Sequence, residues 1–147
     1  MSLLRDCLAE AKRSGHWQPM VDAIPYAKWL GLGLELRDGE PICTMKFDAK
    51  LIGNYSIPAL HGGTLGGLLE SAAVFQLLWA SESIVLPKVV NITVDYLRSA
   101  RAVDTYATGE IFKQGRRVTT VRAIAWQEDR SRPVASANAH FLVYSEE

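Results

Sequence analysis

The sequence predicts an α+β fold in which an antiparallel β-sheet wraps around one long central helix. Three observations support this prediction. The apolar run from His61 to Ala80 has the length of a buried helix, strand-like runs lie on both sides of it, and alternating residues give the later strands one apolar face each. With 147 residues, the chain is long enough for one domain with its own core.

The N-terminal part of the chain is predicted to be helical. Residues 2–14 carry leucines at helical spacing, and Gly15 provides a stop. Pro19 and Pro25 are expected to break the segment that follows, before a short turn of helix over residues 26–30. We therefore divide the single domain, residues 1–147, into a helical extension over 1–28 and a core over 29–147.

Six strand-like runs account for the sheet. The first two flank Asp38-Gly39, a dipeptide typical of β-hairpins, and are therefore predicted to pair antiparallel. Residues 48–60 are expected to form a loop that leads to His61, and Pro87 introduces the last four strands. The runs are 32–37, 42–47, 88–97, 104–113, 118–127 and 133–144.

Composition narrows the possible partners. Sixteen basic residues balance sixteen acidic ones, which argues against general binding to nucleic acid or to an anionic membrane. Cys7 and Cys43 are too few for a disulfide framework or a zinc site, so no metal is expected. The first residues lack the apolar core of a signal peptide, and the run over residues 64–80 is short for a membrane span and contains Glu70. We therefore expect a cytoplasmic protein.

A motif around the long helix resembles a known family. Asn54, the triplet His61-Gly62-Gly63 and Glu70, followed by four strands with a Lys-Gln-Gly-Arg-Arg turn, resemble the hotdog-fold acyl-CoA thioesterases of the phenylacetate-degradation (PaaI-like) type. The resemblance covers residues 29–144. It implies a hotdog fold, two subunits joined into one continuous sheet, and a homotetramer built as a dimer of those dimers.

The same resemblance implies a substrate. The family hydrolyses acyl-CoA thioesters, or acyl-carrier-protein thioesters in relatives, and needs no cofactor beyond the coenzyme A of the substrate. Its acidic residue matches Glu70, and its asparagine, which positions water, corresponds to Asn54.

The chemistry of a thioester explains why these residue types suit it. The leaving thiol has a pKa near about 8.5, so the enzyme must mainly stabilise an oxyanion and activate a nucleophile. Unpaired N–H groups at a helix start can hold an oxyanion, which makes Gly63, with Gly62, the expected donor. Glu70 is expected to activate water as a general base or to attack directly. His61 is either an acid–base group or a residue that orients the loop.

Helix geometry predicts that the site is shared. Seven residues separate Gly63 from Glu70, which corresponds to roughly 10 Å along a straight helix. Both groups should lie within about 3 Å of the reacting carbonyl. We therefore expect Gly63 of one chain to act with Glu70 of another across a twofold axis.

Further polar residues are candidates for substrate binding. Thr64 and Ser71 either tune water or bond to their own helix backbone. Basic residues at strand ends are either solvated or bind the phosphates of coenzyme A. Gly66 and Gly67 are expected to leave room for a facing helix or for pantetheine. The residues of the basic group and its turn are Arg98, Arg101, Lys113, Gly115, Arg116 and Arg117.

Two other functions remain open at this stage. One is a hotdog dehydratase or hydratase, which normally needs a His–acid pair. The other is an acyl-thioester-binding protein without turnover. Phe75, Leu77 and Trp79 slightly favour an aryl or medium-chain acyl group, although they could simply fill the core.

Overall fold

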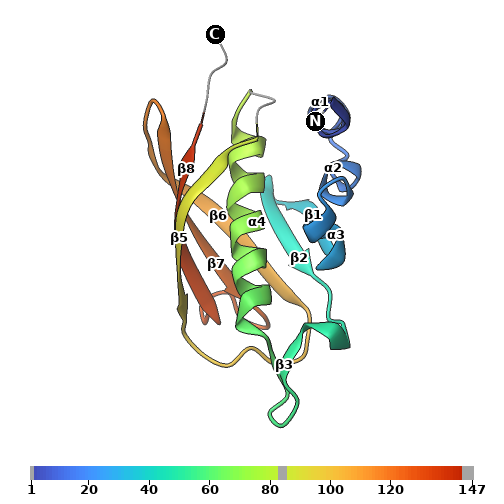
Figure 1. Cartoon of the computed structure of the whole chain (residues 1–147), viewed down its shortest axis with the longest axis vertical. Helices are drawn as coiled ribbons and strands as arrows, with labels where there is room; N and C mark the ends of the chain where they lie inside the picture. The colour runs from blue at the N-terminus through green and yellow to red at the C-terminus, as the bar shows by residue number, and fades with distance from the viewer. Residues whose placement is uncertain (1, 83–85, 144–147) are drawn as a thin grey trace.

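The fold is the predicted α+β arrangement, with a six-stranded antiparallel sheet curved around one long helix (Figure 1). The computed structural model describes residues 2–82 and 86–143. The strand order in the sheet is β1-β2-β6-β7-β8-β5. The strands are β1 (Leu32–Arg37), β2 (Glu40–Met45), β5 (Lys88–Tyr96), β6 (Thr105–Gln114), β7 (Val118–Trp126) and β8 (Ala135–Leu142), and the helix is α4 (Gly62–Ala80).

Small residues let α4 lie close to the sheet. Ala107, Ala123 and Ala125 are buried on the strand faces that meet the helix, as their alternation predicts. A Cβ built on Gly109 of β6 would lie 3.2 Å from both the Ala72 carbonyl oxygen and the Ala73 Cα. The absence of that methyl group allows helix and strand to approach each other.

The first hairpin forms at the predicted turn. Asp38 and Gly39 have φ of 53° and 77°, and Arg37 pairs with Glu40 across them. Positive φ at both central residues is the geometry of a type I′ turn, which matches the twist of the strands.

The N-terminal part contains one more helix than predicted. It comprises α1 (Ser2–Ser14), α2 (Gln18–Asp22) and α3 (Pro25–Trp29). Gly15 ends α1 with φ of 77°, as expected. The expectation that Pro19 breaks the chain was wrong, because it lies in the first turn of α2, where a missing N–H costs nothing. The predicted boundary at residue 28 falls within α3, and the division into extension and core stays a prediction.

The predicted loop over residues 48–60 is more ordered than expected. It holds the 3₁₀ turn η1 (Ala49–Leu51) and a small hairpin of β3 (Ile52–Asn54) and β4 (Ala59–Leu60). Strands this short show too few alternations to be recognised in a sequence. The last strand ends at residue 142 instead of 144, and residue 144 lies outside the described residues.

Within the described residues, no helix has the length and apolar character needed to cross a membrane. The same part of the chain contains no cluster of three histidine, cysteine or acidic side chains suited to a metal ion.

Candidate active site

The start of α4 is capped by His61. The Gly63 N–H donates a hydrogen bond of 2.9 Å to the His61 Nδ1, so this ring nitrogen carries no proton in the capped state. The His61 carbonyl accepts from the Thr64 hydroxyl at 2.6 Å. This places His61 in the role of a cap that orients the helix start, the second of the two roles predicted for it.

Two glycines and a tyrosine fix the backbone around this cap. A Cβ on Gly53 would lie 2.7 Å from the His61 Cα, so β3 can pass the histidine only at a glycine. The Tyr96 ring covers Gly62, whose added Cβ would lie 3.1 Å from the ring. The Tyr96 hydroxyl also donates a 2.9 Å hydrogen bond to the Gly62 carbonyl. The contact between Tyr96 and Gly62 could not be predicted from the sequence pattern of β5, because this contact depends on how the sheet packs against the helix.

The Gly62–Gly63 peptide is therefore bonded at both ends. Tyr96 holds its carbonyl and His61 holds its N–H. For the Gly63 N–H to reach an oxyanion, the His61 ring must turn away. The Gly62 N–H forms no hydrogen bond within the described part of the chain. Of the two expected oxyanion donors, the Gly63 N–H is therefore already hydrogen-bonded, whereas the Gly62 N–H is not bonded to any described residue.

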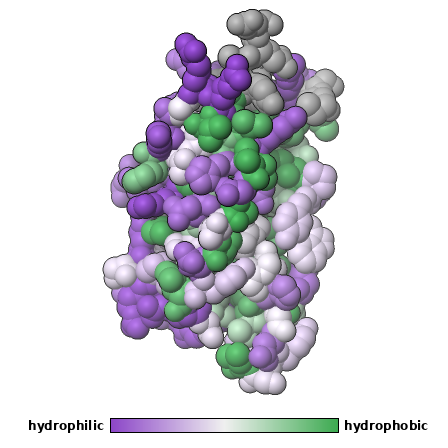
Figure 2. All heavy atoms as spheres, turned by 60° about the vertical axis from the view of Figure 1, so that its left-hand side comes forward, coloured by the Kyte–Doolittle hydropathy of each residue, from purple (hydrophilic) through white to green (hydrophobic). Residues whose placement is uncertain are grey.

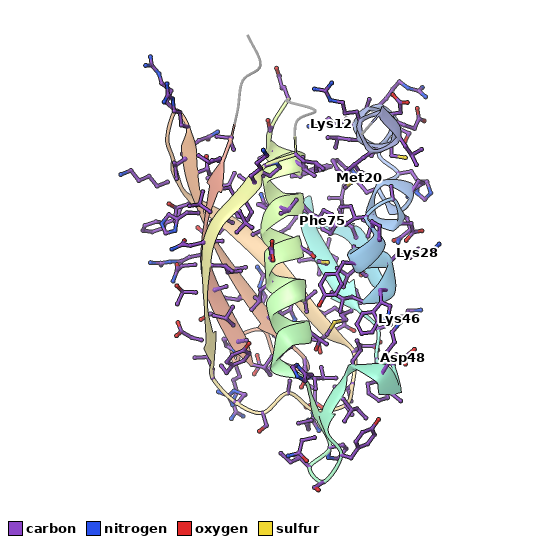
Figure 3. The ribbon with its side chains drawn as sticks, viewed as in Figure 1. Lys12, Met20, Lys28, Lys46, Asp48 and Phe75 are labelled. Carbon is purple, nitrogen blue, oxygen red and sulfur yellow. The ribbon has the colours of Figure 1, made fainter. Side chains whose placement is uncertain are left out.

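Glu70 lies two turns further along α4, at the wall of a pocket of about 290 Å³. The pocket separates α4 from the N-terminal helices, and most of its wall is apolar. Figure 3 shows that Phe75, which also lines it, projects from α4 towards those helices. The lining residues of the helix are Gly67, Glu70, Ser71, Val74 and Phe75.

No hydrogen bond or ion pair holds the Glu70 carboxylate within the described residues. A half-buried carboxylate without a cation is costly unless it is used. Because α4 continues unbroken from residue 62 to 80, the rise of roughly 10 Å between Gly63 and Glu70 holds within one chain. One chain therefore does not bring these two groups together on one carbonyl.

The other candidates near the helix have local roles. The Asn54 Oδ1 accepts from the Ser56 N–H at 2.9 Å in the β3–β4 hairpin. This hairpin lies beyond the start of α4 (Figure 1), whereas Glu70 is two turns into the helix. Thr64 is buried and bonded to the cap, as the structural interpretation of it predicted. Ser71 lines the pocket next to Glu70, so its hydroxyl can meet a ligand there.

The predicted basic group divides into two. Arg98 and Arg101 lie in the connection before β6, near the start of α4, whereas residues 113–117 lie at the end of β6 and in the turn to β7. The ten residues of β6 put roughly 30 Å between them. One chain therefore does not bring the two groups of cations together, because consecutive turns of an antiparallel sheet lie at opposite ends.

Each part of the basic group has its own surroundings. Arg98 and Arg101 line a pocket of about 210 Å³ together with Arg132, which sequence analysis did not single out, and with the acidic Glu128 and Asp129. Arg101 is also paired with Glu128. At the other end, a Cβ on Gly115 would lie 2.6 Å from the Val118 carbonyl oxygen. The tight turn therefore requires a glycine at position 115, and no role in ligand binding is needed to explain it.

The two middle glycines of α4 differ. A Cβ on Gly67 would lie 2.9 Å from Tyr26 Cε1 and 3.1 Å from Leu30 Cδ1, so the space at Gly67 is filled by the chain's own N-terminal segment. The expectation that Gly67 leaves room for a facing helix or pantetheine was therefore wrong. A Cβ on Gly66 would meet no described atom within 4 Å, so only Gly66 remains open.

Comparison with known proteins identifies the family. Residues 53–142 match the family model described as the acyl-CoA thioesterase N-terminal domain. The chain belongs to this thioesterase family. The match contains the capped helix, all four later strands and the small hairpin except for Ile52. The predicted resemblance and the predicted class, a thioester hydrolase, are therefore confirmed at the level of the family.

Individual relatives agree with this assignment. The chain is 29% identical over 135 residues to the medium/long-chain acyl-CoA thioesterase YigI of Salmonella typhimurium, covering 82% of this chain and 86% of that protein. The chain is also 42% identical in sequence to a Chromobacterium violaceum protein of known crystal structure. The two structures superpose with a TM-score of 0.78, over 95% of this chain and 98% of that one. A Bacillus halodurans protein crystallised with CoA shares the fold at 17% identity, with a TM-score of 0.71 and coverage of 99% and 91%.

Proposed function

We propose that this thioesterase hydrolyses acyl-CoA thioesters with Glu70 as the general base or the nucleophile. The observation that carries the proposal is the Glu70 carboxylate at the wall of an apolar pocket, where no other described residue pairs with it. A carboxylate in such a place can take the proton of a water molecule while the water oxygen attacks the thioester carbonyl carbon. The tetrahedral intermediate then collapses and expels the thiolate of coenzyme A.

The Gly63 N–H is proposed as the oxyanion donor, assisted by the open Gly62 N–H. The positive end of the α4 dipole favours negative charge at this position. In the capped state, the His61 ring occupies the Gly63 donor. Substrate binding must therefore displace the His61 ring from the Gly63 N–H.

We propose that two chains complete the site by pairing their β5 strands. Strand β5 is an edge of the sheet, and nearly all of its side chains are exposed, including Val90 at 58% and Tyr96 at 57%. Figure 2 brings this side of the molecule forward and shows hydrophobic side chains along it among polar ones. An unpaired edge with apolar side chains is suited to strand addition.

Antiparallel pairing of β5 with its copy also offers an explanation for the divided basic group. A twofold axis across β5 sets the partner's β6–β7 turn at the same end of the joint sheet as Arg98 and Arg101. Cations from both chains would then face one coenzyme A molecule, whose phosphates suit arginine. The CoA bound to the Bacillus halodurans protein of the same fold supports coenzyme A as the ligand.

A thiol-release assay with a panel of acyl-CoA substrates tests the proposal. We expect Glu70→Gln to lower kcat by about 10²- to 10⁴-fold, the usual contribution of a general base, while the protein stays folded. Glu110→Gln, on an exposed position of β6, is the matched control and should keep wild-type activity. Thiol release that survives Glu70→Gln would reject Glu70 as base or nucleophile. Tight binding without any release from the wild-type protein would instead favour the acyl-thioester-binding alternative.

Subunit mixing tests the shared site. Gly63→Pro removes the N–H in the first helical turn, where proline is tolerated, and Gly63→Ala keeps the N–H as a control for added bulk. Gly63→Pro and Glu70→Gln should each be inactive alone. Refolding them together at equal amounts should restore about a quarter of wild-type activity, because half of the dimers are mixed and each mixed dimer has one intact site. A mixture no more active than its components would contradict the shared site.

A further inference from the structure

We propose that the pocket between α4 and the α2–α3 connection receives the acyl chain, and that this N-terminal segment limits the chain length. The inference rests on the proposed function and specifies its substrate. The pocket is the one that contains Glu70 in its wall, with a volume of about 290 Å³. Its N-terminal side is formed by Leu4, Ala23, Ile24, Pro25, Tyr26 and Ala27.

The chemistry of the lining selects a hydrocarbon. Apart from Glu70, Ser71 and the Tyr26 hydroxyl, every lining side chain is apolar. No basic residue lines the pocket, so it is not built for the phosphates or the charged parts of coenzyme A. An acyl chain would find apolar contact there while its thioester carbonyl stays beside the Glu70 carboxylate.

One end of the pocket is closed by the chain itself. The Tyr26 ring packs against Gly67, one turn before Glu70, at a distance that leaves no space even for a methyl group. Tyr26 is further held by stacking on Trp29, with ring centroids 6.1 Å apart. A ligand that starts at Glu70 can therefore extend only towards Val74 and Phe75.

This direction sets an approximate length. From Glu70 to Phe75 the helix rises by roughly 8 Å. An extended hydrocarbon advances about 1.3 Å per carbon, given carbon–carbon bonds of about 1.5 Å, so the pocket has room for about six carbons beyond the carbonyl. The expected optimum therefore lies between hexanoyl- and octanoyl-CoA, whose chains have five and seven carbons beyond the carbonyl.

The N-terminal wall is firmly attached, which makes the pocket preformed. The Lys12 ammonium on α1 donates to the carbonyls of Leu78 and Ser81 at the end of α4, at 2.7 Å for Leu78, where the helix dipole favours a cation. Trp17 packs on Trp79 with ring centroids 5.8 Å apart. Figure 3 labels Lys12 on α1, near the end of α4 that it contacts. A wall held in this way can discriminate between chain lengths.

The test is the chain-length profile of kcat/KM, measured from acetyl- to dodecanoyl-CoA. Val74→Phe fills the inner part of the pocket and should lower kcat/KM for octanoyl-CoA at least about tenfold relative to butanoyl-CoA, because each excluded methylene is worth a factor of about ten or more. Ile24→Ala enlarges the pocket from the other wall and should move the optimum to longer chains. Val118→Phe, at an exposed position of β7, is the matched control and should leave the profile unchanged.

Two results would overturn the inference. One is a wild-type profile in both folded variants, Val74→Phe and Ile24→Ala. The other is a binding result, needed only if the wild-type protein releases no thiol. The lack of thiol release would by itself count against the proposed function alone. In that case the affinities of octanoyl-CoA and free coenzyme A are compared by calorimetry. Equal affinities would overturn the pocket assignment, and tighter binding of octanoyl-CoA that Val74→Phe abolishes would support it.

Discussion

The peptide between Gly62 and Gly63 is the most constrained feature of the site. Its carbonyl accepts from Tyr96, and its N–H donates to His61. A hydrogen bond to a peptide carbonyl fixes the plane of the peptide and polarises its N–H. Tyr96 would therefore act as a positioning residue for the proposed oxyanion donor, without touching substrate itself.

The substitution Tyr96→Phe tests this role. It keeps the ring that covers Gly62 and removes only the hydroxyl. Loss of one neutral hydrogen bond, worth about 1 kcal/mol, should lower kcat roughly three- to tenfold with little change in KM. The Gly63 amide ¹⁵N resonance should also shift, because its peptide loses a bond. Tyr55→Phe, at the exposed tip of the small hairpin, is the control. A change in KM alone would contradict a role in positioning the oxyanion donor.

At the level of elements, the packing of α4 on β6 depends on Gly109. A Cβ at this position would meet Gln76 Cβ at 3.1 Å and the backbone of Ala72 and Ala73 at 3.2 Å. Backbone atoms cannot move aside as a flexible side chain can. The helix that carries Glu70 is therefore placed by a strand residue with no chemistry of its own.

Gly109→Val should lower the free energy of unfolding by about 1–3 kcal/mol, the usual cost of overpacking a core. Gly33→Ala in β1 is the control. Its Cβ would make only an ordinary contact of 3.5 Å with Gln18, so its stability should stay near that of the wild type. Chemical denaturation monitored by tryptophan fluorescence measures both. Equal stability of the two variants would show that α4 can shift away from β6.

A second link between elements depends on pH. Arg130, in the β7–β8 connection, forms a bidentate ion pair with Glu40 at the start of β2. Its two terminal guanidinium nitrogens donate to the two carboxylate oxygens at 2.6 and 2.9 Å. The hydrogen bond from Arg130 holds the pKa of the Glu40 carboxyl below its usual value. A carboxyl with a lowered folded-state pKa stabilises the fold above its unfolded pKa of about 4.3, and this stabilisation is lost as the pH falls through the folded pKa.

We therefore expect Glu40→Gln to reduce the free energy of unfolding at pH 7 and to make little difference in strong acid. Because the pair is partly exposed, the effect at pH 7 should be at most about 1 kcal/mol. Urea denaturation of wild type and variant between pH 2 and pH 7 measures it. Glu110→Gln serves again as the control, and a difference that grows towards low pH would contradict the assignment.

At the scale of the whole molecule, β5 is a sheet edge that a single chain leaves unpaired. Val90, at 58% exposure, lies where the register with β8 shifts between Val89 and Asn91. If two chains join here, a lysine at this position brings two like charges together across the twofold axis.

Val90→Lys should convert the proposed dimer into monomers and abolish thioesterase activity while leaving each chain folded. Sedimentation velocity measures the mass, and circular dichroism checks the fold. Val118→Lys replaces another exposed valine away from the sheet edge and should remain dimeric and active. A Val90→Lys monomer with full activity would contradict the shared site.

The sequence by itself determined the architecture and the chemical groups. Alternation in the later strands, the Asp38-Gly39 turn and the long apolar run predicted a sheet around a helix, because these patterns follow from local backbone geometry. Glu70 stood out for a similar reason, since an acid without a nearby cation on an apolar helix is costly wherever that helix packs. The rise per residue of a helix also separates Glu70 from Gly63.

Only the tertiary structure decided how these groups are surrounded. The hydrogen bond of His61 to Gly63, the hydroxyl of Tyr96 on the Gly62 carbonyl and the ring of Tyr26 against Gly67 join segments that are remote or that adopt no regular pattern. The division of the basic residues between two ends also follows from strand direction and order, which residue spacing does not encode. Such contacts depend on the packing of side chains in three dimensions, and that packing determines which glycine is open, which donor is occupied and where the acyl pocket ends.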